Sequence, residues 1–114
     1  MVTDDPTLTN PDHYRTLWEN DFVRVLDYTD EPGDRTTPHD HPNSVMVSLS
    51  DFSRRLSAGE RVFDTALTTG QVVWLAAQRH SGENTGTTPT HTILIELKGD
   101  AAGTMNPSAL GPRT

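Results

Sequence analysis

Residues 90–97, with the sequence THTILIEL, form the most regular strand pattern of the chain. Ile93 and Ile95 alternate with other side chains, and Gly99 marks the end of the segment. Alternation over eight residues predicts a half-buried β-strand, because successive side chains of a strand point to opposite faces. Glu96 then lies on the face opposite the two isoleucines.

Similar short segments, rich in Val, Ile, Leu, Thr and aromatic residues, occur along the rest of the chain. Between residues 13 and 98 no window keeps a helical apolar period, so we expect an all-β sandwich or barrel. Residues 13–98 form the predicted barrel, whereas residues 1–12 and 99–114 are predicted to be mobile or surface-draped tails. The predicted strands are residues 14–19, 22–28, 36–41, 44–50, 53–57, 61–64, 65–68, 71–75, 80–84 and 90–97.

The composition excludes several classes of protein. The chain has 114 residues, which corresponds to one domain, and its net charge of -7 argues against nucleic acid and anionic membranes as partners. It has no cysteine, so it has no disulfide framework and no thiol nucleophile. No apolar run approaches the ~20 residues of a membrane span, and no signal peptide is evident, so we expect a cytoplasmic protein. Its small size and low hydrophobic content of 32% favour a homodimer.

Two histidine motifs carry the chemistry. In the segment Pro38-His39-Asp40-His41-Pro42, the two histidines lie two residues apart. The prolines favour extended backbone, in which both imidazoles share one face and can bind one metal ion. His80 follows the apolar segment 71–75. Taken separately, the His39/His41 pair is better explained by two solvated histidines on a loop, and His80 by a surface histidine at the start of a hairpin.

Taken together, the two motifs resemble those of the cupin superfamily, and in particular those of small single-domain cupins. The resemblance implies a cupin-type antiparallel jelly-roll barrel. It also implies one divalent transition metal deep in the barrel, held by His39, His41 and His80. The residues that carry the resemblance are Gly33, His39, His41, Gly70, His80 and Asn84.

One departure from the family pattern bears on function. Val45 or Met46 stands where the first cupin motif has a glutamate, which leaves three histidines and no carboxylate. Such a donor set suits Fe(II), which we favour, or Zn, Ni, Mn or Cu. By resemblance to three-histidine cupins, we expect a mononuclear dioxygenase acting on a small organic substrate. A Zn or Ni Lewis-acid isomerase, cyclase or decarboxylase and a non-catalytic ligand-binding cupin remain open.

Three further residues are candidates for substrate binding. Val45 would form an apolar wall beside the metal, and Trp74 would line the barrel. Arg24 would meet an anionic substrate at the barrel mouth, unless it is a solvated or interface arginine.

Other polar residues are candidates for supporting roles. His91 either points into the barrel or lies at a wet strand end. Glu96 is either a fourth ligand or acid/base, or a surface carboxylate. Arg54 and Arg55 are predicted to lie on the surface, and no catalytic acid/base pair is evident.

Overall fold

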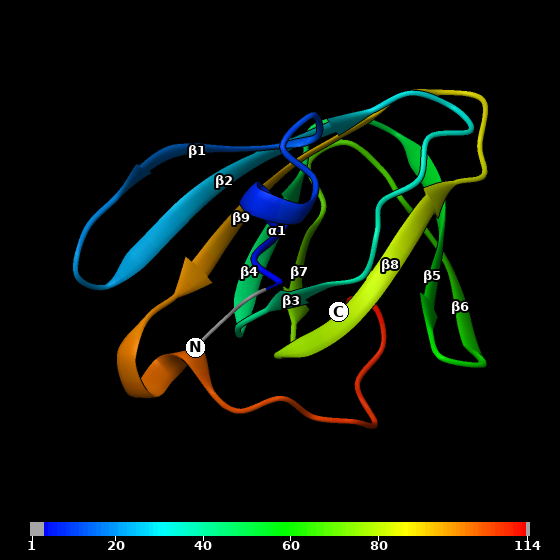
Figure 1. Cartoon of the computed structure of the whole chain (residues 1–114). Coiled ribbons are helices and arrows are strands. Elements are labelled where there is room, and N and C mark those ends of the chain that lie inside the picture. The colour runs from blue at the N-terminus through cyan, green and yellow to red at the C-terminus, as the bar shows by residue number, and fades with distance from the viewer. Residues whose placement is uncertain (1–3, 114) are drawn as a thin grey trace.

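Two antiparallel β-sheets face each other in the structure, a computed structural model that describes residues 4–113 (Figure 1). The first element is a short helix, α1 (Pro6–Thr9), and a 3-10 helix, η1 (Gly99–Ala102), follows the last strand. The prediction of an all-β fold is confirmed. The strands are β1 (Tyr14–Glu19), β2 (Val23–Asp30), β3 (His39–His41), β4 (Ser44–Ser48), β5 (Phe52–Ala58), β6 (Arg61–Leu67), β7 (Val72–Leu75), β8 (Gln78–Asn84) and β9 (Thr90–Leu97).

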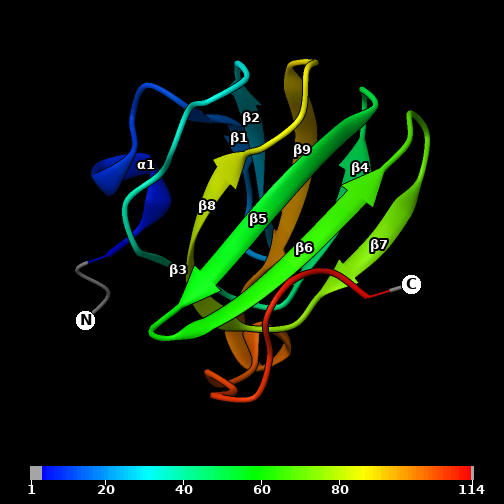
Figure 2. The same ribbon diagram turned by 90° about the vertical axis from the view of Figure 1, so that its right-hand side faces the viewer.

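The strand order defines a jelly-roll barrel. One sheet has the order β1-β2-β9-β4-β7, and the other has the order β3-β8-β5-β6. Figure 2 shows the four-stranded sheet in front of the five-stranded one. β9 pairs along its whole length with β2 and also with β4, so it lies at the centre of the larger sheet. The buried core between the sheets includes Leu26, Tyr28, Phe52, Leu75 and Leu94.

The alternation in β9 is as predicted, but its apolar face is the outer one. Thr90, Thr92, Leu94 and Glu96 are buried between the sheets, while the intervening side chains are partly exposed. Ile93 and Ile95 therefore lie on the outside of the barrel. Alternation along a strand shows which residues share a face, but it does not show which face is buried. In β9 the buried face carries polar groups of the barrel interior.

The N-terminal segment closes one seam of the barrel rather than forming a loose tail. Helix α1 packs against β1 and β3, the edge strands of the two sheets. Asp5 caps this helix by accepting a hydrogen bond from the backbone N–H of Thr7 at 2.9 Å, and Pro6 is buried. The described part of residues 1–12 is thus fixed across the gap between the sheets.

The C-terminal segment closes the opposite seam, between β7 and β6. The backbone of Arg113 exchanges two hydrogen bonds of 2.7 Å with Trp74 of β7. Arg61 of β6 donates to the carbonyls of residues 107 and 108, and Leu110 is buried. The prediction of a mobile or merely draped C-terminal tail is corrected, because these contacts involve both edge strands.

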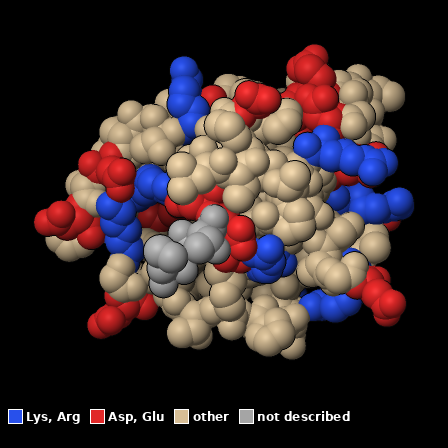
Figure 3. All heavy atoms as spheres, in the orientation of Figure 1, with Lys and Arg blue, Asp and Glu red and all other residues tan. Residues whose placement is uncertain are grey.

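Charged side chains are distributed around the rim of the molecule. In the view of Figure 3, basic groups lie next to acidic ones. Ion pairs such as Arg79–Asp4 at 2.6 Å and Arg24–Asp5 at 2.9 Å hold the N-terminal segment in place. Within the part of the chain that the structure describes, no helix is long and apolar enough to cross a membrane.

Candidate metal centre

The three predicted histidines converge inside the barrel. β3 and β8 pair in antiparallel register, with His39 opposite His80 and His41 two residues further along β3. One ring nitrogen of each histidine lies within 4.8 Å of those of the other two, and all three side chains are buried. The His-x-His spacing and the strand pairing thus bring two distant segments to one group of donors.

Each of these imidazoles has an acceptor at its Nδ1 atom. Nδ1 of His39 lies 2.7 Å from the Thr37 carbonyl oxygen, and Nδ1 of His80 lies 2.7 Å from Oε1 of Gln78. Nδ1 of His41 lies 3.2 Å from Oε2 of Glu96. These acceptors favour a proton on Nδ1 and leave the Nε2 lone pairs for a metal ion.

The surroundings also keep His39 and His80 neutral. Burial, together with the neighbouring His41, lowers the pKa of His39 to about 3. Burial, with His41 and His39, lowers the pKa of His80 well below its ordinary value. Neutral imidazole is the form that binds metals, so the environment prepares the ligands for an ion.

Glu96 supports a ligand and is not placed as one itself. Besides its contact with His41, it accepts two hydrogen bonds from Arg24, at 2.9 and 2.7 Å. Arg24 in turn pairs with Asp5 at 2.9 Å. The chain Asp5–Arg24–Glu96–His41 orients this imidazole from behind, as carboxylates commonly do at metal-ligating histidines. Arg24 is occupied by carboxylates of the protein.

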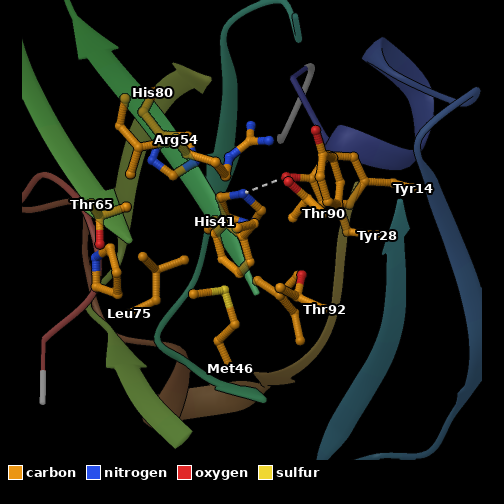
Figure 4. A pocket seen from close by; sticks show the side chains of 14 residues that line it. Tyr14, Tyr28, His41, Met46, Arg54, Thr65, Leu75, His80, Thr90 and Thr92 are labelled. Atoms are coloured by element: carbon orange, nitrogen blue, oxygen red, sulfur yellow. Dashed lines mark hydrogen bonds between the residues drawn. The ribbon is translucent and has the colours of Figure 1, made fainter. Parts of the chain in front are cut away.

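Tyr14 lies at the centre of the cluster, although the sequence pattern identified it only as the start of a strand. Its hydroxyl oxygen is 3.3 Å from Nε2 of His39 and 3.4 Å from Nε2 of His41; the latter contact is the dashed line in Figure 4. Burial raises the pKa of Tyr14 above its ordinary value. The phenol is therefore a neutral hydrogen-bond donor facing the same point as the imidazoles.

A cavity of about 40 Å³ adjoins the histidines inside the barrel. This volume holds only a few water-sized groups, because one water occupies roughly 10–15 Å³ on this measure. In Figure 4 Arg54, Tyr14, Tyr28 and Thr90 lie toward one end of the cavity, and Met46 and Leu75 lie toward the other. The lining also includes Phe52, Leu56, Thr65, Thr92 and Leu94.

Arg54 is inside this cavity and not on the surface. On β5 it shares a face with Phe52 and Leu56, whereas Arg55 points outward and pairs with Asp64. The prediction that both arginines are exposed is therefore wrong for Arg54. The alternation in residues 52–56 already places Arg54 on the same face as Phe52 and Leu56. The sequence does not show a partner for the charge, however, and a charged residue is rarely buried without one.

That partner is Asp30 on β2. Arg54 donates from Nη1 to Oδ2 of this aspartate, and its guanidinium lies 4.9 Å from the centre of the Tyr28 ring. Burial opposes ionisation of Asp30, but hydrogen bonds from Tyr28 and Asn84 and the charge of Arg54 hold its pKa below the ordinary value. The barrel interior thus contains a fixed, fully ionised pair beside the histidines.

The other sequence candidates lie away from the cavity. Val45 and Trp74 are paired neighbours on the outer face of the five-stranded sheet, where Trp74 is 40% exposed. Their assignment as lining residues is corrected, because the inward residues of β4 are Ser44, Met46 and Ser48. His91 is also outward and contacts Asp27 at 2.7 Å.

A barrel of this topology with three inward histidines is the cupin fold, also called the double-stranded β-helix. A cupin domain from Bordetella pertussis superposes with a TM-score of 0.70 and 24% identity, covering 75% of this chain and 92% of its own. A double-stranded β-helix protein from Klebsiella pneumoniae gives a TM-score of 0.60 and 20% identity over 77% of each chain.

More distant cupins share the same architecture. A cupin-family protein from Methanocaldococcus jannaschii has a TM-score of 0.60 and 9% identity, covering 74% of this chain and 77% of its own. No protein-family model matches the chain, and no curated protein has a significantly similar sequence. These similarities establish the fold, so the function has to be inferred from the site itself.

The residues present fit a divalent transition metal. Three buried imidazoles, each with an acceptor at Nδ1, are a donor set typical of such ions. No carboxylate replaces the missing motif glutamate within the cluster of residues 39, 41 and 80, because the oxygens of Glu96 are engaged with His41 and Arg24.

Proposed function

We propose that this protein is a metal-dependent enzyme that acts on a small anionic organic molecule, and that it uses dioxygen when the metal is ferrous iron. The observation that carries the proposal is the convergence of three buried histidines beside a cavity that also contains a buried guanidinium. A bound metal would supply Lewis acidity, and iron would also supply the redox chemistry that activates dioxygen.

Arg54 would bind the anionic group of the substrate. Of its guanidinium nitrogens, Nη1 is committed to Asp30, and the others make no hydrogen bond to residues 4–113. The arginine stays charged at all relevant pH values, and the ion pair with Asp30 fixes its position. A carboxylate that enters the cavity can therefore accept hydrogen bonds from a donor that is already oriented.

Tyr14 and the apolar wall would complete the site. The Tyr14 hydroxyl can donate a hydrogen bond to a substrate oxygen placed beside His39 and His41. Met46 and Leu75 exclude water from the opposite side of the cavity. Exclusion of water strengthens the electrostatic contacts inside and protects a reactive intermediate from hydrolysis.

Metal analysis tests the first part of the proposal. Protein purified without chelator should contain close to one transition metal per chain, and His39→Ala or His80→Ala should remove it. His91→Ala is the matched control, because this histidine points to the outer face and contacts Asp27. Equal metal content in all of these variants would refute the site.

Oxygen uptake tests the second part. The protein is reconstituted anaerobically with Fe(II) and then exposed to oxygen with a panel of small carboxylic acids, thiols and diketones. We expect uptake with a carboxylate-bearing substrate, none in the zinc form, and a large increase in KM in Arg54→Met. Turnover by the zinc or nickel form without oxygen would replace the oxygenase proposal with a Lewis-acid isomerase, cyclase or decarboxylase.

A further inference from the structure

The outer face of the five-stranded sheet is apolar, whereas that of the four-stranded sheet is polar. On the larger sheet the outward apolar side chains of the central strands include Val25, Ile93, Ile95, Val45 and Val47, while the outward polar residues Asp27, Thr29 and His91 lie together at one corner. On the smaller sheet the outward positions include Ser53, Arg55, Ser57, Arg79, Ser81 and Glu83. An exposed apolar face of this extent on one side only is typical of an interaction surface.

The strand register aligns three of these residues with two tryptophans in one row across the whole sheet. Trp18 is opposite Val25, Val25 is opposite Ile95, Ile95 is opposite Val45, and Val45 is opposite Trp74. The row reads the same in both directions, with a tryptophan at each end and a β-branched residue at the three central positions. The terminal tryptophans are 55% and 40% exposed.

From this row we propose that a second copy of the chain packs on the outer face of the five-stranded sheet, which forms a two-fold symmetric dimer. A two-fold interface uses the same patch on both copies, so the patch must be complementary to itself. A two-fold axis in the interface plane through Ile95 exchanges the two halves of the row and brings tryptophan against tryptophan. Tryptophan is among the residues enriched in protein interfaces.

The charges on this face also favour a second copy. The charged residues on this face are Arg15 and Asp27, which pair at 3.6 Å in one corner next to His91, and Arg113, which lies beside Trp74 at the far edge. The face therefore has no excess of acidic groups, while the chain as a whole carries -7. Two copies can approach through this face without bringing their acidic surfaces together.

The size of the face meets the requirement of a specific dimer. Five strands spaced by ~4.8 Å, with outward residues over six steps of ~3.4 Å, give a projected area of roughly 500 Å² per copy. Two copies would bury about 1,000 Å² in projection, and more in accessible area because the side chains protrude, which is enough for a specific interface.

The test is the mass in solution, by light scattering at tens of micromolar protein, of wild type and of two matched variants. Val72→Lys changes an exposed valine in the apolar face, and Val62→Lys changes an equally exposed valine on the polar face of the other sheet (58% and 57% exposed). We expect a wild-type dimer that persists at high salt. Its Kd should rise at least about tenfold in Val72→Lys and stay unchanged in Val62→Lys.

A third variant in the same experiment changes the residue at the centre of the row. Ile95→Lys should abolish the dimer, with circular dichroism as the check on folding. A wild-type monomer would overturn the proposal, including one that binds lipid vesicles or another protein through this face. Equal effects of the two valine variants would also overturn it. Metal content is measured in parallel, so failure of the dimer is distinguished from failure of the metal site.

Discussion

Replacing Glu96 by glutamine tests how far the metal site depends on the group behind its ligand. Glu96 is buried, accepts two hydrogen bonds from Arg24, and contacts Nδ1 of His41 at 3.2 Å. Glu96→Gln keeps the shape of the side chain but removes its charge and leaves one acceptor oxygen for two donors. Arg24 retains Asp5 as a partner at 2.9 Å, so the fold should be preserved.

The expected loss of metal affinity follows from the contact between Glu96 and His41. Loss of a hydrogen-bonded partner of a ligating histidine typically weakens metal binding about 10–100-fold, which corresponds to roughly 1.4–2.7 kcal/mol. The assay is a competition titration of zinc against a chromophoric chelator. Glu83→Gln is the control, because this glutamate pairs with Arg35 at the surface. Affinity within about twofold of wild type in folded Glu96→Gln would refute the supporting role of this carboxylate.

Three further outcomes are expected. The metal-free protein should lose stability as the pH falls from ~6.5 towards 3. His39 and His80 have lower pKa values in the folded protein than in the unfolded chain, so the unfolded chain binds protons first as the pH falls. Thermal melts at stepped pH measure this loss. Gly82→Ala should destabilise by about 1–3 kcal/mol in urea unfolding, because a Cβ there would lie 2.2 Å from Nη2 of Arg54. Deletion of residues 105–114 should lower the melting temperature markedly, because it opens the seam between β7 and β6; a melt like that of wild type would show that this segment is dispensable.

The convergence of the three histidines was predictable in part because one signal is local. His39 and His41 are two residues apart between prolines, and strand alternation alone places them on one face. Only the resemblance to the cupin motifs linked His80 to them. Pairing of β3 with β8 then brings the two segments together.

The remaining site residues depend on contacts that no local pattern specifies. Tyr14 reaches the cluster across the barrel, from a strand 25 residues before His39. Arg54 is buried because Asp30 lies opposite it, a pairing across 24 residues of chain. Val45 and Trp74 were placed on the wrong face because alternation gives two faces without saying which one is inside.

The inverted polarity of β9 has a physical reason. A barrel that contains a polar site must direct threonines, an arginine and carboxylates inward, and each of these groups needs a partner. Within residues 4–113 every side-chain nitrogen and oxygen that has no accessible surface has one. The β-branched residues that the strands still require for their stability then occupy the outer face, where they remain available for association.

In β9 a residue that supports the candidate metal site is the direct neighbour of a residue of the proposed interface. Glu96 points inward and orients a ligand of the metal centre, while Ile95 points outward at the middle of the apolar row. Because neighbouring side chains of a strand point to opposite faces, one strand can serve the site and the proposed interface without the two competing for the same surface. The strand with the most regular alternation in the sequence is therefore the one on which both proposals depend.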